Sequence, residues 1–165
     1  MINFHTGHHP LLPESTFPGW LALSLEIWER IEELVADAGM TLLLENMFEP
    51  TPQVQLDLLA QLESRHAAFT LDVAHAHIYG AVSIDAWWSQ LGPAVAEVHL
   101  HDTDGFSDDH LPIGDGALDW QRVFEDVFRN APDAVKVIEM PFEAGLASLR
   151  RIKSAGYSDL QLELL

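Results

Sequence analysis

The chain has 165 residues, a mean hydropathy near zero and a formal charge of −18, from 26 acidic and 8 basic side chains. Cysteine is absent, which excludes disulfides and thiolate metal sites, so any metal must bind through His, Asp, Glu and water. The negative charge, and apolar runs far shorter than the roughly 20 residues that span a bilayer, predict a soluble, cytoplasmic protein without nucleic-acid or membrane partners.

Short apolar runs rich in β-branched or aromatic residues alternate with longer amphipathic stretches along the chain. This alternation is typical of successive βα units in a parallel sheet. In chain order, we expect strands at residues 2–5, 41–45, 68–72, 95–100, 134–139 and 160–164. Helices are expected between them at residues 18–38, 52–65, 83–90, 119–129 and 143–155. No linker or change in composition divides the chain, so we expect a single domain over residues 1–165.

Two α/β architectures are compatible with these elements. A doubly wound nucleotide-binding sheet would carry a G-x-G-x-x-G loop or a P-loop after a strand, and neither motif is present. We therefore predict a partial TIM-type β/α barrel with about six parallel strands and alternating helices. No organic cofactor is expected.

Most of the predicted strands end on, or close to, a residue of a type that binds metals. In a β/α barrel, the carboxyl ends of the strands meet at one face, and the chemistry takes place there. The candidate ligands at these strand ends are His5, Glu45, Asp72, His99 and Glu139.

Side chains alternate along a strand, so Thr70 and Asp72 share one face, as do His99 and His101. Carboxylates converging in a barrel interior would leave uncompensated negative charge unless a cation binds there. Any one of these residues could instead cap a helix or meet solvent, but their recurrence at successive strand ends favours a metal site. We predict that one divalent ion is bound by Glu45, Asp72, His99 and Glu139.

A long polar loop at residues 101–118 adds further candidates, and loops of this length usually have a function. It contains Asp102, Asp104 and Asp109 as well as an Asp-x-His pair, Asp108 and His110. Together with the Asp-x-x-His pair at 72–75, this pair could bind a second metal or orient the first ligands. The remaining histidines are interpreted as surface residues or as supports behind the ligands; they are His8, His9, His66 and His77.

Five motifs in this order resemble the signature of the xylose-isomerase-like TIM barrels: LLLEN, LDVAHAH, HLHD, DDHLPIGDGALDW and IEMP. This superfamily includes sugar isomerases and epimerases and the endonuclease IV type of abasic-site nuclease (AP endonuclease family 2). The resemblance to its ketose 3-epimerases implies one Mn²⁺, Co²⁺ or Mg²⁺ held by a Glu, Asp, His, Glu quartet. That quartet matches Glu45, Asp72, His99 and Glu139 here.

The nuclease branch implies three zinc ions with further ligands, and the matching positions here are His5, His75, Asp108 and His110. His5 resembles the residue that closes the third barrel strand. The chain is therefore expected to be truncated at its N-terminus relative to the family, without the first two βα units. One zinc ligand of the nucleases normally comes from this missing region, so it has no counterpart in this chain.

The basic residues help to discriminate between these two activities. All eight Lys and Arg fall on predicted helices, close to helix ends, or early in a strand, as Lys136 does. Predicted loops 6–17, 46–51, 73–82 and 101–118 contain none. Because DNA and sugar phosphates need cationic contacts, a neutral sugar-like hydroxy-carbonyl substrate is favoured.

The resemblance then implies that the metal chelates carbonyl and hydroxyl oxygens of the substrate and stabilises an enediolate, with Glu45 and Glu139 as the catalytic acid/base pair. His75, His101 and His110 would position oxygens. The expected function is a metal-dependent sugar isomerase or epimerase. The alternatives are an endonuclease IV-like phosphodiesterase and a metal-binding barrel fragment without catalytic activity.

The number of predicted strands also predicts that copies of the chain associate with one another. An eight-stranded barrel closes only when every strand has two neighbours, and six strands would leave two open edges. Exposed edges and apolar surface invite pairing, and symmetric pairs are the commonest assembly. We expect a homodimer or a higher homo-oligomer.

Overall fold

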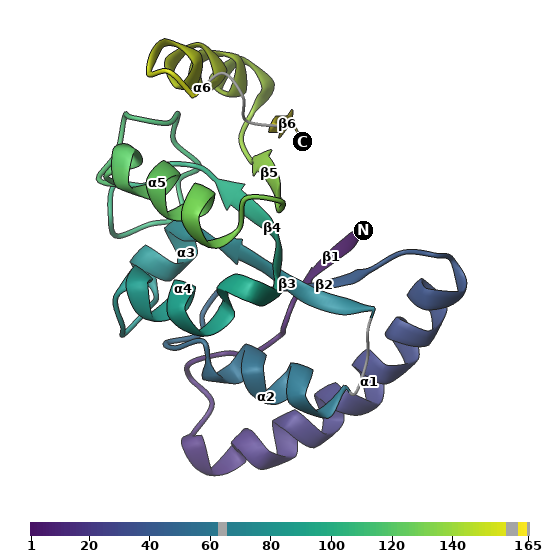
Figure 1. Cartoon of the computed structure of the whole chain (residues 1–165). Coiled ribbons are helices and arrows are strands. Elements are labelled where there is room, and N and C mark those ends of the chain that lie inside the picture. The colour runs from purple at the N-terminus through teal and green to yellow at the C-terminus, as the bar shows by residue number, and fades with distance from the viewer. Residues whose placement is uncertain (63–65, 158–161, 165) are drawn as a thin grey trace.

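The computed structural model describes residues 1–62, 66–157 and 162–164. It contains one parallel sheet whose six strands follow one another in chain order, so each strand pairs with its sequence neighbours (Figure 1). The strands are β1 (Ile2–His5), β2 (Leu42–Glu45), β3 (Ala67–Asp72), β4 (Val95–Leu100), β5 (Val135–Ile138) and β6 (Leu162–Leu164). This sequential order of parallel strands confirms the predicted partial TIM barrel.

Helices lie on the outer side of this curved sheet (Figure 1). They are α1 (Phe17–Asp37), α2 (Gln53–Gln61), α3 (Val73–Ile78), α4 (Ile84–Leu91), α5 (Trp120–Asn130) and α6 (Phe142–Ser154). Two 3₁₀ turns, η1 (Glu14–Thr16) and η2 (Gly92–Ala94), precede α1 and β4. Among the described helices, none combines the length and the apolar character that a membrane crossing requires.

The predicted elements agree with the structure apart from a few boundaries and one helix. The strand predicted at 134–139 ends at Ile138, so Glu139 follows it directly. The helix predicted at 52–65 ends at Gln61, and residues 63–65, like 160–161 of the last predicted strand, lie outside the described residues. The predicted loop 73–82 begins instead with α3, which is too short to show a helical period in the sequence.

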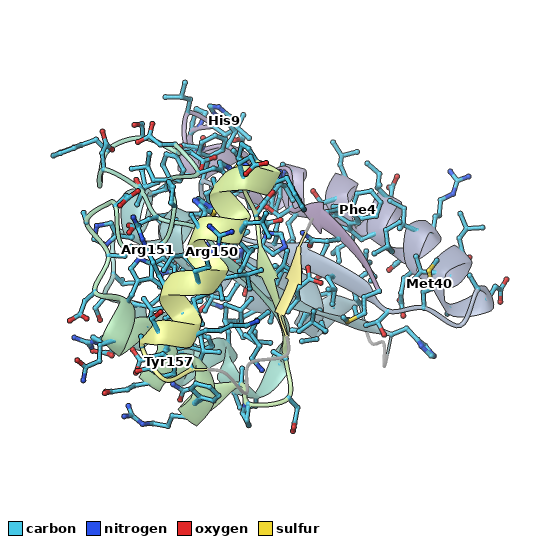
Figure 2. The ribbon with its side chains drawn as sticks, turned by 90° about the horizontal axis from the view of Figure 1, so that it is seen from above. Phe4, His9, Met40, Arg150, Arg151 and Tyr157 are labelled. Carbon is cyan, nitrogen blue, oxygen red and sulfur yellow. The ribbon has the colours of Figure 1, made fainter. Side chains whose placement is uncertain are left out.

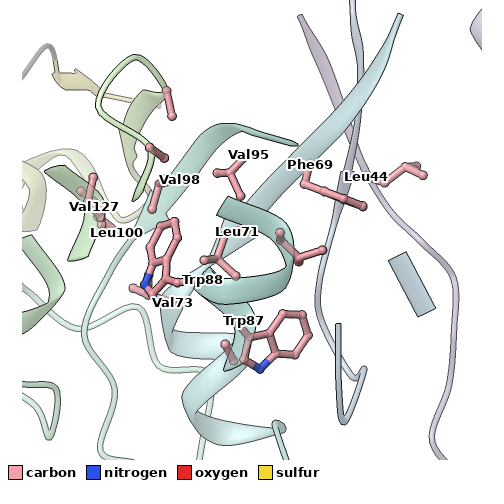
Figure 3. Packing of buried hydrophobic residues seen from close by; sticks show 14 of the residues in the cluster. Leu44, Phe69, Leu71, Val73, Trp87, Trp88, Val95, Val98, Leu100 and Val127 are labelled. Carbon is pink, nitrogen blue, oxygen red and sulfur yellow. The ribbon is translucent and has the colours of Figure 1, made fainter. Parts of the chain in front are cut away.

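The hydrophobic core lies between the sheet and the helices. Leu44, Phe69, Leu71, Val98 and Leu100 point outward from β2, β3 and β4 toward this layer, where Trp87 and Trp88 of α4 join them (Figure 3). Because side chains alternate along a strand, the intervening residues face the inner side of the sheet. At the carboxyl ends of the strands, these inner residues are polar and include Glu45, Thr70, Asp72 and His99.

We predict that Phe69→Ala lowers the free energy of unfolding by about 3–5 kcal/mol, because Phe69 is fully buried and its removal leaves a cavity. Phe106→Ala is the matched control, since Phe106 is 89% exposed, and it should change stability by less than about 0.5 kcal/mol. Urea denaturation followed by circular dichroism measures both. Equal losses in the two variants would contradict this description of the core.

Candidate metal centre

Glu45, Asp72, His99 and Glu139 converge at the carboxyl ends of β2 to β5. Each offers one ligand atom, and these four atoms lie within 4.8 Å of one another. His99 is central: its Nδ1 lies 2.9 Å from Glu139 Oε2, 3.2 Å from Glu45 Oε1 and 3.9 Å from Asp72 Oδ2. The parallel register places Asp72 level with His99 on neighbouring strands, whereas Glu45 is level with Thr70 and Glu139 directly follows β5. The structure thus brings the predicted quartet together.

Three atoms at the middle of this group are buried without a hydrogen-bond partner among the described residues. They are Glu45 Oε1, His99 Nδ1 and Glu139 Oε2, which face one another. Glu45, Asp72 and His99 are buried, while the Glu139 side chain is 35% exposed. Buried polar atoms normally have partners, so orphaned ligand atoms that point at one another fit a site built for a cation.

The charges at this centre are strongly coupled. Burial alone would raise the pKa of Glu45, but the contacts with His5 and His99 outweigh it and hold that pKa well below its usual range. Burial likewise favours neutral His99, yet the carboxylates of Glu139, Glu45 and Glu97 raise its pKa to about 12. Without a metal, protonated His99 therefore supplies the positive charge that these carboxylates need.

Neighbouring side chains hold the ligands in place. Asn3 Nδ2 donates to Glu45 Oε2 at 2.5 Å, and Glu97 Oε1 lies 3.0 Å from His99 Nε2. The buried Asn46 side chain binds both backbone groups of Asp72, at 2.9 and 3.0 Å. Such outer partners fix the orientation of metal ligands. The sequence prediction assigned no role to Asn3, Asn46 or Glu97, although Glu97 shares a strand face with His99.

A second group of ionisable residues adjoins the quartet. His75 Nε2 lies 3.2 Å from Asp108 Oδ2, and His110 Nε2 lies 3.3 Å from Asp108 Oδ1. His101 Nε2 lies 3.0 Å from Asp72 Oδ2, and its ring stacks on that of His110 with centroids 4.0 Å apart. His75, His101 and Asp72 also form a triplet with ligand-like spacing. The residues predicted for a second metal or for substrate positioning therefore gather beside the quartet.

His5 lies at the margin of this arrangement, on the edge strand β1. Its Nε2 is 3.5 Å from Glu45 Oε2, and its side chain is 48% exposed. The contact with Glu45 raises the pKa of His5 despite partial burial. His5, Glu45 and His75 together could also bind an ion.

Two other acidic residues of the loop at 101–118, Asp102 and Asp104, have a structural role. The fully buried Asp102 accepts hydrogen bonds from the backbone N–H groups of Thr103, Gly114, Gly116 and Leu118 and from Trp120 Nε1. Asp104 accepts from Phe106 N and Ser107 N. Asp108 and His110 are therefore held by a folded loop. His110 has a φ of 49°, an uncommon conformation for a residue other than glycine, and its Nδ1 lies 2.7 Å from the Glu139 carbonyl oxygen.

We predict that the metal-free protein is most stable between about pH 4 and 6.5. Burial lowers the pKa of His75, but Asp108 and Asp72 raise it from 6.5 to about 9, so its contribution is complete below pH 6.5 and is lost as the pH rises through 9. The bond from His75 lowers the pKa of Asp108 from 3.8 to about 2, so that contribution is lost as the pH falls toward 2.

Urea unfolding with a chelator present, repeated across this pH range, measures the effect. The variant His75→Gln should flatten the alkaline side of the profile. A stability that increases between pH 6.5 and 9 would contradict the charge assignment.

Comparison with known proteins agrees with this geometry. The chain is 28% identical over 146 residues to the uncharacterized protein MJ1311 of Methanocaldococcus jannaschii, a match that covers 84% of this chain and 50% of that protein. This chain therefore spans half the length of that curated relative.

Solved structures of similar fold are also longer than this chain. A D-tagatose 3-epimerase-like protein is 25% identical with a TM-score of 0.79, over 95% of this chain and 62% of its own. The TTHB071 protein from Thermus thermophilus, whose crystals were soaked with ZnCl₂, is 28% identical with a TM-score of 0.75, over 92% and 59%. The 3-keto-D-glucoside 4-epimerase of E. coli, at 17% identity and a TM-score of 0.71 over 92% and 60%, shows the shared fold alone.

One family model, the xylose isomerase-like TIM barrel, matches residues 1–155. This match covers nearly the whole chain and includes every residue of the quartet. Together with the order of the strands and the convergence of the ligands at their carboxyl ends, it shows that the chain belongs to the xylose isomerase-like TIM barrel family.

Proposed function

We propose that this chain binds one divalent metal ion through Glu45, Asp72, His99 and Glu139, and that it acts as an isomerase or epimerase on a neutral sugar-like hydroxy-carbonyl compound. The observation that carries the proposal is the convergence of four ligand atoms within 4.8 Å, three of them buried without a hydrogen-bond partner among the described residues. Three carboxylates and one imidazole suit Mn²⁺, Co²⁺, Mg²⁺ or Zn²⁺. The name of one relative, the D-tagatose 3-epimerase-like protein, supports the reaction class.

The reaction requires a proton to leave and return at a carbon next to a carbonyl group. A bound divalent ion would polarise that carbonyl group and so acidify the neighbouring C–H bond. Glu45 is placed to accept the proton, because its carboxylate lies within the group, with Oε1 3.2 Å from His99 Nδ1. Glu139 is partly exposed and follows β5, on the other side of His99 in the sheet, so it can return a proton from a different direction.

The loops at 6–17, 46–51, 73–82 and 101–118 contain no Lys or Arg, which favours an uncharged substrate. Arg151 of α6 approaches the loop at 101–118, where its Nη1 donates to the carbonyl oxygen of Ile113 at 2.8 Å. The same nitrogen lies 2.6 Å from Asp115 Oδ1. Arg151 is therefore already engaged by the loop and is poorly placed to bind a phosphate.

One observation favours the endonuclease-like alternative. His75 and His110 each lie within ion-pair distance of Asp108, and all three match additional zinc ligands of that branch. Against this alternative stand the charge of −18 and the lack of cations in the loops, since binding to DNA depends on phosphate contacts. The proposal of a sugar substrate is therefore preferred.

We predict that Glu139→Gln weakens the binding of Mn²⁺, Co²⁺ and Zn²⁺ at least about ten-fold, because it removes a ligand charge from the quartet. Glu143→Gln is the matched control, since Glu143 lies exposed in the first turn of α6 and should bind metal like the unmodified chain. Isothermal titration calorimetry on protein freed of metal measures the constants. If the unmodified chain shows no metal site that Glu139→Gln weakens, the assignment of the metal centre to this quartet is wrong.

We predict that the manganese-loaded protein exchanges deuterium from solvent into the carbon next to the carbonyl group of a neutral ketose such as D-tagatose. The exchange, followed by NMR, should disappear in Glu139→Gln because a catalytic carboxylate is lost. No cleavage of an abasic-site oligonucleotide is expected. Metal-dependent cleavage that is lost in His110→Ala would establish the nuclease alternative, and metal binding without exchange on a panel of neutral ketoses would favour the non-catalytic one.

A further inference from the structure

His99 of β4 has carboxylates on both sides of its ring. Its Nδ1 points into the quartet, where it lies 2.9 Å from Glu139 Oε2 and 3.2 Å from Glu45 Oε1. Its other ring nitrogen, Nε2, lies 3.0 Å from Oε1 of Glu97, two residues earlier on the same face of the strand. The Glu97 side chain is only 12% exposed. Glu97 therefore contacts the metal-binding imidazole from the side that faces away from the quartet.

The direction of Nδ1 determines what Nε2 does when a metal is bound. If Nδ1 gives its lone pair to the metal, neutral His99 carries its proton on Nε2, and this N–H group donates to Glu97 Oε1. A carboxylate that accepts such a bond holds the ring in one orientation and makes the opposite nitrogen a stronger donor. Glu97 can thus act on the metal without touching it.

The neighbouring strand holds Glu97 in place. Thr70 of β3 is level with Glu97, and its hydroxyl group donates to Glu97 Oε1 at 3.3 Å. Two residues further along the same pair of strands, Asp72 is level with His99. A chain of contacts therefore runs from Thr70 through Glu97 and His99 to the quartet. Every member of it is carried by two strands that are paired with each other.

The charge of Glu97 is met by His99 and not by the cations of α6. Arg150 and Arg151 extend from this helix, which lies on the outer side of the sheet (Figure 2). The Arg151 guanidinium group is already paired with Asp115, at 2.6 Å. Glu97 shares the inner face of the sheet with His99, so a change in its charge reaches the centre through the imidazole ring.

We propose that Glu97 is a positioning residue of the metal centre, which strengthens the bond from His99 Nδ1 and so shifts the preference of the centre toward Zn²⁺ relative to Mn²⁺. Imidazole nitrogen suits Zn²⁺, whereas Mn²⁺ depends more on oxygen ligands, which the three carboxylates of the quartet supply. This role rests on the proposed function only in that the quartet binds the metal, and it does not require catalysis.

Calorimetric titration of metal-free protein with Zn²⁺ and with Mn²⁺ tests this role. Glu97→Gln keeps the size of the side chain and an acceptor oxygen but removes the charge, so it should weaken Zn²⁺ binding at least about ten-fold and Mn²⁺ binding less. The exposed Glu143→Gln is the control and should change neither. Thr70→Val removes the hydroxyl group that holds Glu97 and should cause a smaller loss of the same kind, whereas Thr70→Ser should keep the unmodified affinity.

Proton NMR of the zinc-loaded chain gives a second readout that a merely structural role would not change. The His99 Nε2 proton should be shifted downfield by its bond to the carboxylate and should move upfield in Glu97→Gln. Circular dichroism checks that this variant folds, and Thr70→Val carries both measurements if it does not.

The outcomes separate this role from the proposed function. If Glu139→Gln weakens Zn²⁺ binding and Glu97→Gln does not, the role of Glu97 is wrong and the quartet stands. An equal loss for Zn²⁺ and Mn²⁺ in Glu97→Gln would show a general effect of charge and would overturn the action through His99. An unmodified chain without a metal site at the quartet would overturn both proposals.

Discussion

The candidate site depends on the balance between buried carboxylates and the positive charge that they require. Glu45 and Asp72 are almost entirely removed from water, and both have a pKa below the usual range despite the cost of burial. That is possible only because imidazole groups face them. His99 and His101 fulfil this role in the absence of metal. A divalent ion bound at the same place would take over the compensation and release the proton that His99 holds.

The parallel sheet makes this balance geometrically possible. The strands from β1 to β5 are paired in register apart from an irregularity between Phe69 and Thr70. Asp72 is level with His99, whereas Glu45 is level with Thr70, so the ligands come from staggered levels of neighbouring strands. Asn46 connects two of these levels, because its side chain binds the backbone of Asp72 and its carbonyl oxygen lies 2.9 Å from His75 Nδ1. The hydrogen bonds of Asn46 thus link the quartet to the second ionisable group.

The alternation of short apolar and long amphipathic segments was sufficient to predict the order of the strands, because each period reflects burial on one face. Strand ends such as Glu45 and Asp72 could be assigned for the same reason. Helix α3 could not, since six residues give little periodicity and its capping residue, Asp72, was interpreted only as a ligand. The structural role of Asp102 could not be predicted either. The sequence does not distinguish a buried carboxylate that accepts hydrogen bonds from backbone N–H groups from an exposed loop carboxylate. Contacts between distant segments, such as Asn3 with Glu45, need the folded chain.

The bonding of Asp102 has a consequence for how this loop can diversify. One buried carboxylate satisfies the backbone of four loop residues and an indole, and a side chain at Gly116 would collide with that carboxylate and with the Thr103 carbonyl oxygen. The path of the loop is therefore set by residues that do not point at the candidate site. Asp108, which does point at the site, takes no part in this bonding, so the chemistry of the site can change at Asp108 without altering the hydrogen bonds that set the path of the loop.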